Sequence, residues 1–177
     1  MPATAAAATH HARRWLGFAG VWLLLDLLTK WWAMVALKTH HSISLLGDLL
    51  RLTYMENRGM AFSLAFLPPW VLTAVALVAA VYISLLLWRK NFGWWKNLSL
   101  ALVLAGALGN AIDRIRFGYV IDFIDSDFPD WIIERWPIFN LADSGVTVGM
   151  VLLAAFILFE KSPKTGSSGV ATNAGSE

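Results

Sequence analysis

Residues 70–88 read WVLTAVALVAAVYISLLLW, an apolar stretch without a charged side chain. A helix needs about 20 mostly apolar residues to cross the hydrocarbon core of a bilayer. The stretch therefore predicts a transmembrane helix. Working outward from it, we find four stretches of this length and character, at 15–37, 66–88, 94–112 and about 136–159.

The composition of the whole chain also indicates a membrane protein. Of the 177 residues, 58% are hydrophobic and ten are tryptophan. Almost everything lies in or between the four spans, so we expect an integral membrane α-helical fold with a single domain at 13–160. The flanking segments, 1–12 and the Ser/Gly/Thr-rich 161–177, are expected to be disordered.

Several kinds of site are excluded by what the sequence lacks. It has no cysteine, which excludes disulfides and thiolate chemistry. Its four histidines form two adjacent pairs, His10-His11 and His40-His41, without metal-ligand spacing on a helix face. The net charge of +2 is spread along the chain without a basic stripe. We therefore expect no metal, no cofactor and no nucleic acid partner.

The basic residues predict the orientation in the membrane. Arg89, Lys90 and Lys96 crowd the short turn between the second and third spans, with no acid among them. Cytoplasmic loops carry an excess of Lys and Arg, so this turn is expected in the cytoplasm. With four spans, both termini are then cytoplasmic, and segments 40–65 and 113–135 lie outside.

The first outer segment predicts a small β element between the first and second spans. Apolar and polar residues alternate on both sides of Gly47-Asp48, a pattern typical of a hairpin. The second outer segment, 113–135, is rich in acids and carries Trp131. We predict a loop there, either a lid at the lipid headgroups or a solvated loop with an interfacial anchor.

Polar residues inside the first span share one helix face. Asp26, Thr29 and Lys30 are three and four residues apart, so their side chains are neighbours. We favour an Asp26–Lys30 ion pair that holds helices together, and the alternative is that Lys30 meets a substrate. After this span, Asn57 and Gly59 would suit a turn that binds peptide backbone, because Asn donates and accepts and Gly permits positive φ.

The third span ends in a polar cluster. Small residues at intervals of four, including Ala105 and Gly109, would let another helix approach closely. Asn110, Asp113 and Arg114 follow on the same side. Arg114 is expected to pair with Asp113, or with a carboxylate of the pair Asp122 and Asp143, which it would keep ionised. Asp113 competes with these two acids for a catalytic role.

Two acids stand at the mouths of apolar stretches. Asp122 lies between the third and fourth spans, and Asp143 opens the fourth. Carboxylates are costly near hydrocarbon, which makes them candidates for function. Two that converge can share a proton and activate a water. A structural interpretation of Asp143 is also open, because Asn140 resembles an N-cap and an acid three residues later suits a helix start.

Taken in order, five motifs resemble the lipoprotein signal peptidases (type II). They are Asp26-x-x-Thr29-Lys30, Asn57-x-Gly59-x-Ala61-Phe62, Gly109-Asn110-x-x-Asp113-Arg114, Val120-Ile121-Asp122-Phe123 and Asn140-Leu141-Ala142-Asp143-Ser144. Their order, and their places at the ends of four apolar spans, make the match specific over residues 13–160.

The resemblance implies an aspartyl endopeptidase of the bacterial inner membrane, with four helices and a small extracytoplasmic β element. Such an enzyme removes signal peptides from prolipoproteins whose cysteine carries a diacylglyceryl group. The family's catalytic pair falls on Asp122 and Asp143. Its supporting polar residues match Asp26, Lys30, Asn57, Asn110, Asp113, Arg114 and Asn140. The implied partners are the lipidated substrate and membrane lipid, no metal or nucleotide is needed, and we expect a monomer with its site near the extracytoplasmic face.

Two other classes of function fit part of the pattern. Intramembrane acids are common in ion or proton carriers, but a relay should reach both sides, and here most acids gather at the outer end. A non-catalytic scaffold would use buried polar residues only to join helices. That class gives no reason for Asp122, outside the helices, to accompany Asp143.

Overall fold

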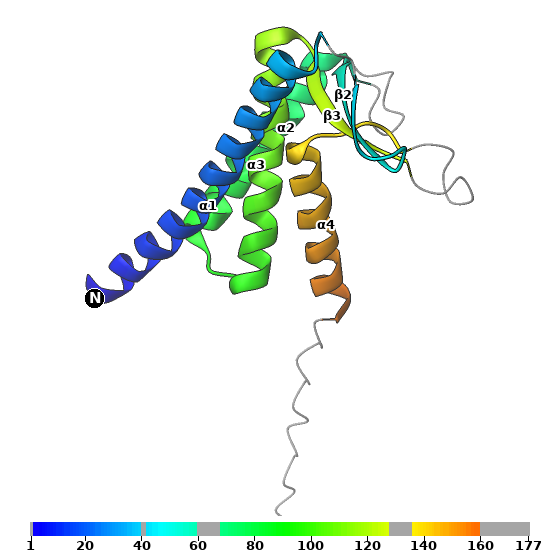
Figure 1. Cartoon of the computed structure of the whole chain (residues 1–177). Coiled ribbons are helices and arrows are strands. Elements are labelled where there is room, and N and C mark those ends of the chain that lie inside the picture. The colour runs from blue at the N-terminus through cyan, green and yellow to red at the C-terminus, as the bar shows by residue number, and fades with distance from the viewer. Residues whose placement is uncertain (1, 40–41, 60–67, 128–135, 160–177) are drawn as a thin grey trace, which may run out of the picture.

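The computed structural model describes residues 2–39, 42–59, 68–127 and 136–159. Within these ranges it contains four helices, with a three-stranded sheet at one end of them (Figure 1). The helices are α1 (Pro2–Ala36), α2 (Pro69–Arg89), α3 (Trp94–Phe117) and α4 (Leu141–Phe159). All four are long and apolar enough to cross a membrane, which confirms the four predicted spans.

Two helix boundaries differ from the prediction. α3 continues to Phe117, where Gly118 closes it in the left-handed conformation at φ 80°, a usual way for a helix to end. α4 begins at Leu141 rather than near 136. The residues before it are extended, because Phe139 forms a β-bridge with Ile124.

The N-terminal segment of the chain is part of α1. We expected 1–12 to be disordered, whereas α1 begins at Pro2. Proline suits a first helical position, and five alanines follow it before residue 9, which favours a helix. The start of the second span at 66 and the predicted disordered tail, 161–177, lie outside the described residues.

The predicted hairpin is present, and a third strand joins it. β1 (Ser42–Leu46) pairs with β2 (Leu50–Asn57), and β2 pairs with β3 (Val120–Ser126), both antiparallel. β3 (Val120–Ser126) shows that the prediction of a loop over 113–135 was wrong for these residues. Its first four residues are all buried, so the strand lacks the apolar–polar alternation that marks a half-exposed strand. Residues 128–135 of that segment, with Trp131, lie outside the described residues.

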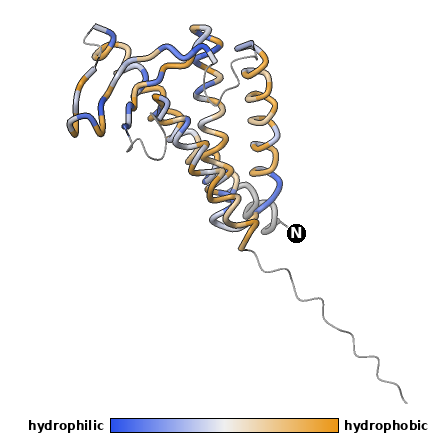
Figure 2. The backbone as a smooth tube through the Cα atoms, turned by 90° about the vertical axis from the view of Figure 1, so that its right-hand side faces the viewer, coloured by the Kyte–Doolittle hydropathy of each residue, from blue (hydrophilic) through white to orange (hydrophobic). Residues whose placement is uncertain are grey.

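The central helix of the bundle is α3, which packs against the other three helices. Ala101 and Leu104 of α3 belong to one hydrophobic core cluster. The other helices contribute to it Trp15 and Ala19 of α1 and Leu87 of α2. The remaining faces of α1, α2 and α4 carry exposed apolar side chains, as expected for surfaces that face lipid. Figure 2 shows apolar residues along the helices and polar residues gathered toward the sheet.

Exposed tryptophans lie near both ends of the bundle. Trp31 and Trp70 lie toward the sheet, whereas Trp88 and Trp94 lie at the opposite end. Trp70 and Trp88 are separated by about 27 Å along α2 at ~1.5 Å per residue. This is close to the thickness of the hydrocarbon core, about 30 Å. Tryptophan is enriched at both membrane interfaces, and the spacing of these tryptophans matches that pattern.

Glycines allow α3 and α4 to approach closely. A Cβ on Gly106 would overlap the carbonyl oxygen of Ala142 and lie 2.6 Å from the side chain of Val146. A Cβ on Gly149 would lie 2.7 Å from the carbonyl oxygen of Ser99. Neither neighbour on the main chain can move without shifting a helix, so the glycines set the α3–α4 separation.

We expect Gly106→Ala to lower stability by about 1–3 kcal/mol, the usual cost of overpacking, because α4 must move away from α3. The measurement is thermal unfolding of the purified protein in detergent. Gly20→Ala is the matched control, since nothing lies within 4 Å of a Cβ there. Equal unfolding temperatures for the two variants would contradict the close-packing argument.

Candidate active site

The first turn of α4 is built by reciprocal capping. The backbone N–H of Asp143 donates to Asn140 Oδ1 at 2.8 Å, and the backbone N–H of Asn140 donates to Asp143 Oδ2 at 3.3 Å. Asn140 is therefore the N-cap, as the sequence predicted, and Asp143 completes a capping box. The predicted structural role of Asp143 is confirmed, but the capping box involves only one of its two carboxylate oxygens, Oδ2.

Asp122 lies on β3 and is fully buried. Its Oδ1 accepts a hydrogen bond from Asn140 Nδ2 at 2.6 Å, and its Oδ2 accepts one from Asn57 Nδ2 at 2.8 Å. Asn57 is oriented by the turn that follows β2, where the backbone N–H of Gly59 donates to Asn57 Oδ1 at 3.0 Å. Gly59 has a φ of 124°, the positive φ that we associated with a glycine in this turn.

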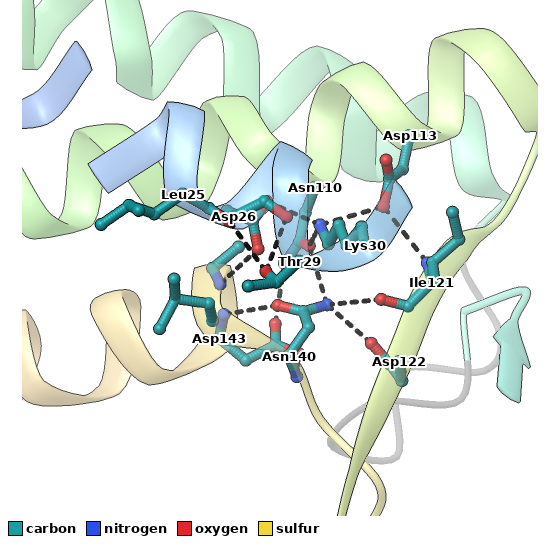
Figure 3. Close-up of polar contacts among 12 residues, drawn as sticks. Leu25, Asp26, Thr29, Lys30, Asn110, Asp113, Ile121, Asp122, Asn140 and Asp143 are labelled. Atoms are coloured by element: carbon teal, nitrogen blue, oxygen red, sulfur yellow. Dashed lines mark hydrogen bonds and ion pairs between the residues drawn. The ribbon is translucent and has the colours of Figure 1, made fainter. Parts of the chain in front are cut away.

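Asn140 joins the two acids. Figure 3 shows it between Asp122 of β3 and Asp143 of α4, with hydrogen bonds to both. The second oxygen of Asp143, Oδ1, accepts from Asn110 Nδ2 at 2.7 Å. The structure thus brings both acids onto one shared neighbour, and each carboxylate receives a side-chain amide donor.

The environment of Asp122 favours its protonated form. Burial and the negative charge of Asp143 raise the pKa of Asp122 to about 7, against the hydrogen bonds from Asn57 and Asn140, which lower it. A carboxyl group with such a pKa can keep a proton near neutral pH. Two neighbouring carboxylates that hold one proton between them are suited to general acid–base chemistry.

A buried ion-pair cluster lies beside the two acids. The predicted Asp26–Lys30 pair is confirmed, with Lys30 Nζ 2.9 Å from Asp26 Oδ2. Lys30 also lies 2.9 Å from Asp113 Oδ2 and donates to Asn110 Oδ1 at 3.0 Å. Because its side chain is only 2% exposed and its ammonium group lies against Asp26, Asp113 and Asn110, the alternative that Lys30 meets a substrate is not supported.

Of the two kinds of partner expected for Arg114, Asp113 pairs with Lys30 instead. Within the described part of the chain Arg114 forms no ion pair. It lies near enough to Asp143, Asp122 and Asp113 to interact with them electrostatically. Its positive charge therefore offsets part of the negative charge of the site.

One buried acid was not singled out from the sequence. Asp125 of β3 is 2% exposed, accepts a hydrogen bond from Thr53 Oγ1 at 3.0 Å, and lies 3.5 Å from Arg51 Nε. These contacts join β3 to β2. Asp125 was not recognised because we predicted a loop over 113–135. The β-branched and aromatic residues next to it are typical of a strand.

No three His, Cys, Asp or Glu side chains are grouped to hold a metal ion within the ranges that the structure describes. The site is therefore built from carboxylates, carboxamides and two cations. What this arrangement can do is bind and transfer protons at a point shared by β3 and α4.

Comparisons with known proteins agree with these observations. The family model described as Signal peptidase (SPase) II matches residues 18–159. A protein of Psychromonas ingrahamii named Lipoprotein signal peptidase is 41% identical over 157 residues, which cover 85% of this chain and 88% of the relative. A protein of the same name from Burkholderia mallei is 44% identical over 147 residues, which cover 78% of this chain and 84% of the relative.

A solved structure has the same fold. It is a bacterial membrane enzyme determined by the in meso method at 2.3 Å resolution, with a TM-score of 0.74 and 26% sequence identity. The match covers 86% of this chain and 92% of that one. With four membrane-spanning helices, a family model over most of its length and relatives above 40% identity, this chain belongs to the signal peptidase II family of membrane peptidases.

Proposed function

We propose that the protein is an aspartyl endopeptidase that removes signal peptides from prolipoproteins, cleaving before a cysteine that carries a diacylglyceryl group. Membership of the signal peptidase II family supports the removal of signal peptides. The names of the relatives support lipoprotein precursors as the substrates. The observation that carries the aspartyl mechanism is the convergence of Asp122 and Asp143 on Asn140.

In the proposed mechanism the pair holds one proton, and burial places it on Asp122. Ionised Asp143 takes a proton from a water, whose oxygen attacks the scissile carbonyl carbon. Protonated Asp122 donates a hydrogen bond to the carbonyl oxygen and stabilises the developing oxyanion. Collapse of the tetrahedral intermediate breaks the C–N bond, and the leaving amine takes a proton from the pair.

Amide groups around the pair are proposed to hold the substrate backbone. Asn57, Gly59 and Asn140 lie where strand β2 and helix α4 meet the acids, and Asn110 holds Asp143. We assign Arg114 to charge balance, since it interacts with both aspartates. One chain supplies every one of these groups, and we therefore expect a monomer to be active.

We place the site at the extracytoplasmic face of the bacterial inner membrane, with both termini in the cytoplasm. The basic turn with Arg89, Lys90 and Lys96 lies at the end of the bundle opposite the sheet, which supports this orientation. Water can reach a site at the interface while the acyl chains of the substrate remain in lipid. The carrier and scaffold alternatives do not account for membership of a peptidase family.

We expect Asp122→Asn and Asp143→Asn each to lower kcat by at least about 100-fold, the size of a lost general acid–base contribution. Both substitutions are nearly isosteric, so the variants should remain folded. The measurement is cleavage of a synthetic prolipoprotein peptide by purified protein, with thermal unfolding as the folding check. Asp48→Asn serves as control because Asp48 is exposed on the hairpin turn. Substantial activity in either dyad variant would overturn the assignment.

The substrate assignment predicts dependence on the lipid. A peptide with a diacylglyceryl-modified cysteine should be cleaved on the N-terminal side of that cysteine. The same peptide without the lipid should be cleaved far more slowly. Mass spectrometry of the two products identifies the bond. Equal rates for the two peptides would remove the lipid from the proposal while leaving the peptidase activity intact.

The proton on Asp122 predicts a pH limit. The protonated form is lost as pH rises through its pKa of about 7, so kcat/KM should fall above that pH. Asn57→Ala removes a hydrogen bond that lowers this pKa, and the fall should therefore move to higher pH. The measurement is the pH profile of lipopeptide cleavage, with Asn91→Ala at the opposite end of the bundle as control. A fall that stays in place, or moves to lower pH, would contradict the prediction.

A further inference from the structure

Three charged side chains are buried together near the membrane interface. Asp26 is fully buried, and Lys30 and Asp113 are each 2% exposed. Removing charges from water is costly, and a buried ion pair is often no more stabilising than apolar residues of the same volume. Fold stability alone is therefore a weak explanation for this cluster, and its contacts toward the two aspartates provide a stronger one.

Each acid of the cluster binds a backbone amide next to one of the proposed catalytic residues. Asp26 Oδ1 accepts a hydrogen bond from the N–H of Ala142 at 2.8 Å, and Ala142 directly precedes Asp143. Asp113 Oδ2 accepts one from the N–H of Ile121 at 3.2 Å, and Ile121 directly precedes Asp122. Lys30 contacts both acids at 2.9 Å, so a single ammonium group links the two backbone positions (Figure 3).

Lys30, together with Asn140 Nδ2, which donates to Asn110 Oδ1 at 3.2 Å, orients the Asn110 side chain. An ammonium group has only donors, so the amide oxygen of Asn110 must face it, at 3.0 Å. The amide nitrogen then points at Asp143 Oδ1, to which it donates at 2.7 Å. The reversed amide would place donor against donor at Lys30 and acceptor against acceptor at Asp143.

We propose that Lys30 is a positioning residue for the peptidase reaction: through Asp26, Asp113 and Asn110 it holds the two aspartates in register with one another. The proposal rests on the assignment of Asp122 and Asp143 as the catalytic pair. Lys30 itself touches no reacting atom. Its contribution is to fix the backbone before each aspartate and the amide donor of one of them, and small displacements of such groups cost large factors in rate.

The first test compares Asp113→Asn with Asp113→Ala. Both leave Lys30 paired with Asp26, so their charge is the same, but only Asn keeps an oxygen that can accept from both Lys30 and the N–H of Ile121. We expect Asp113→Asn to stay within about threefold of wild-type kcat and Asp113→Ala to lose about 10- to 100-fold, with KM within about twofold for both. A role in charge compensation alone predicts equal losses, and equal losses would overturn the proposal.

The second test removes the ammonium group without leaving a buried charge unpaired. In the triple variant Asp26→Asn/Lys30→Met/Asp113→Asn, both backbone amides still have an amide oxygen as acceptor. The ammonium link between the two positions is lost, and Asn110 Oδ1 keeps only the donor of Asn140. We expect kcat at least about tenfold below that of Asp113→Asn, with KM within about twofold. A folded triple variant with the kcat of Asp113→Asn would overturn the role of Lys30. Exposed Asp48→Ala is the control and should behave as wild type.

Amide hydrogen exchange, followed by mass spectrometry on the full-length protein, gives a readout independent of activity. Asp113→Ala should speed exchange at Ile121 and leave Ala142 unchanged, and Asp26→Ala should do the reverse. If either Ala variant does not fold, the Asn variants are compared instead. Asp26 contacts Ala142 and Lys30 with different oxygens, whereas Asp113 contacts Ile121 and Lys30 with one oxygen. We therefore expect a larger loss of kcat in Asp26→Asn than in Asp113→Asn. Equal losses or unselective exchange would overturn the proposal, whereas failure of wild type to cleave would overturn only the peptidase assignment.

Discussion

The hydrogen bonds of Asn140 are the interaction on which the site depends. With its side-chain oxygen Asn140 caps α4, and with its side-chain nitrogen it donates to Asp122 on β3. Helix α4 and strand β3 are thereby joined at one carboxamide. The glycines of α3 and α4 place the capped helix end against α3, where Asn110 reaches Asp143. The geometry of the two acids therefore depends both on the close packing of α3 and α4 at their glycines and on the hydrogen bonds of Asn140.

Much of this arrangement was predictable because its signals are local. Apolar length predicted four helices, period-two alternation predicted the β1–β2 hairpin, and helical spacing predicted the Asp26–Lys30 pair. The sequence around Asn140 also predicted the N-cap of α4. The lipid-modified substrate, in contrast, followed from resemblance to a family and from no pattern of charge or hydropathy.

What could not be predicted depends on contacts between distant segments. Strand β3 is buried from Val120 to Phe123, so it shows no alternation, and its pairing with β2 joins residues more than sixty positions apart. The partner of Asp113 was misassigned for the same reason. Spacing along α3 favours the adjacent Arg114, whereas the actual partner, Lys30, comes from α1. The roles of these charges became visible only when the three helices and the sheet were seen together.

The separation of the site's parts along the chain has a consequence for biogenesis. Asn57 ends β2, Asp122 lies on β3 and Asp143 opens α4, and these segments meet only when the sheet has docked on the helix bundle. A nascent chain that has inserted its first three helices holds no assembled pair of acids. In the proposed aspartyl peptidase, the pair of acids is therefore complete only after the fourth helix and the sheet have come together, which is the last step of assembly.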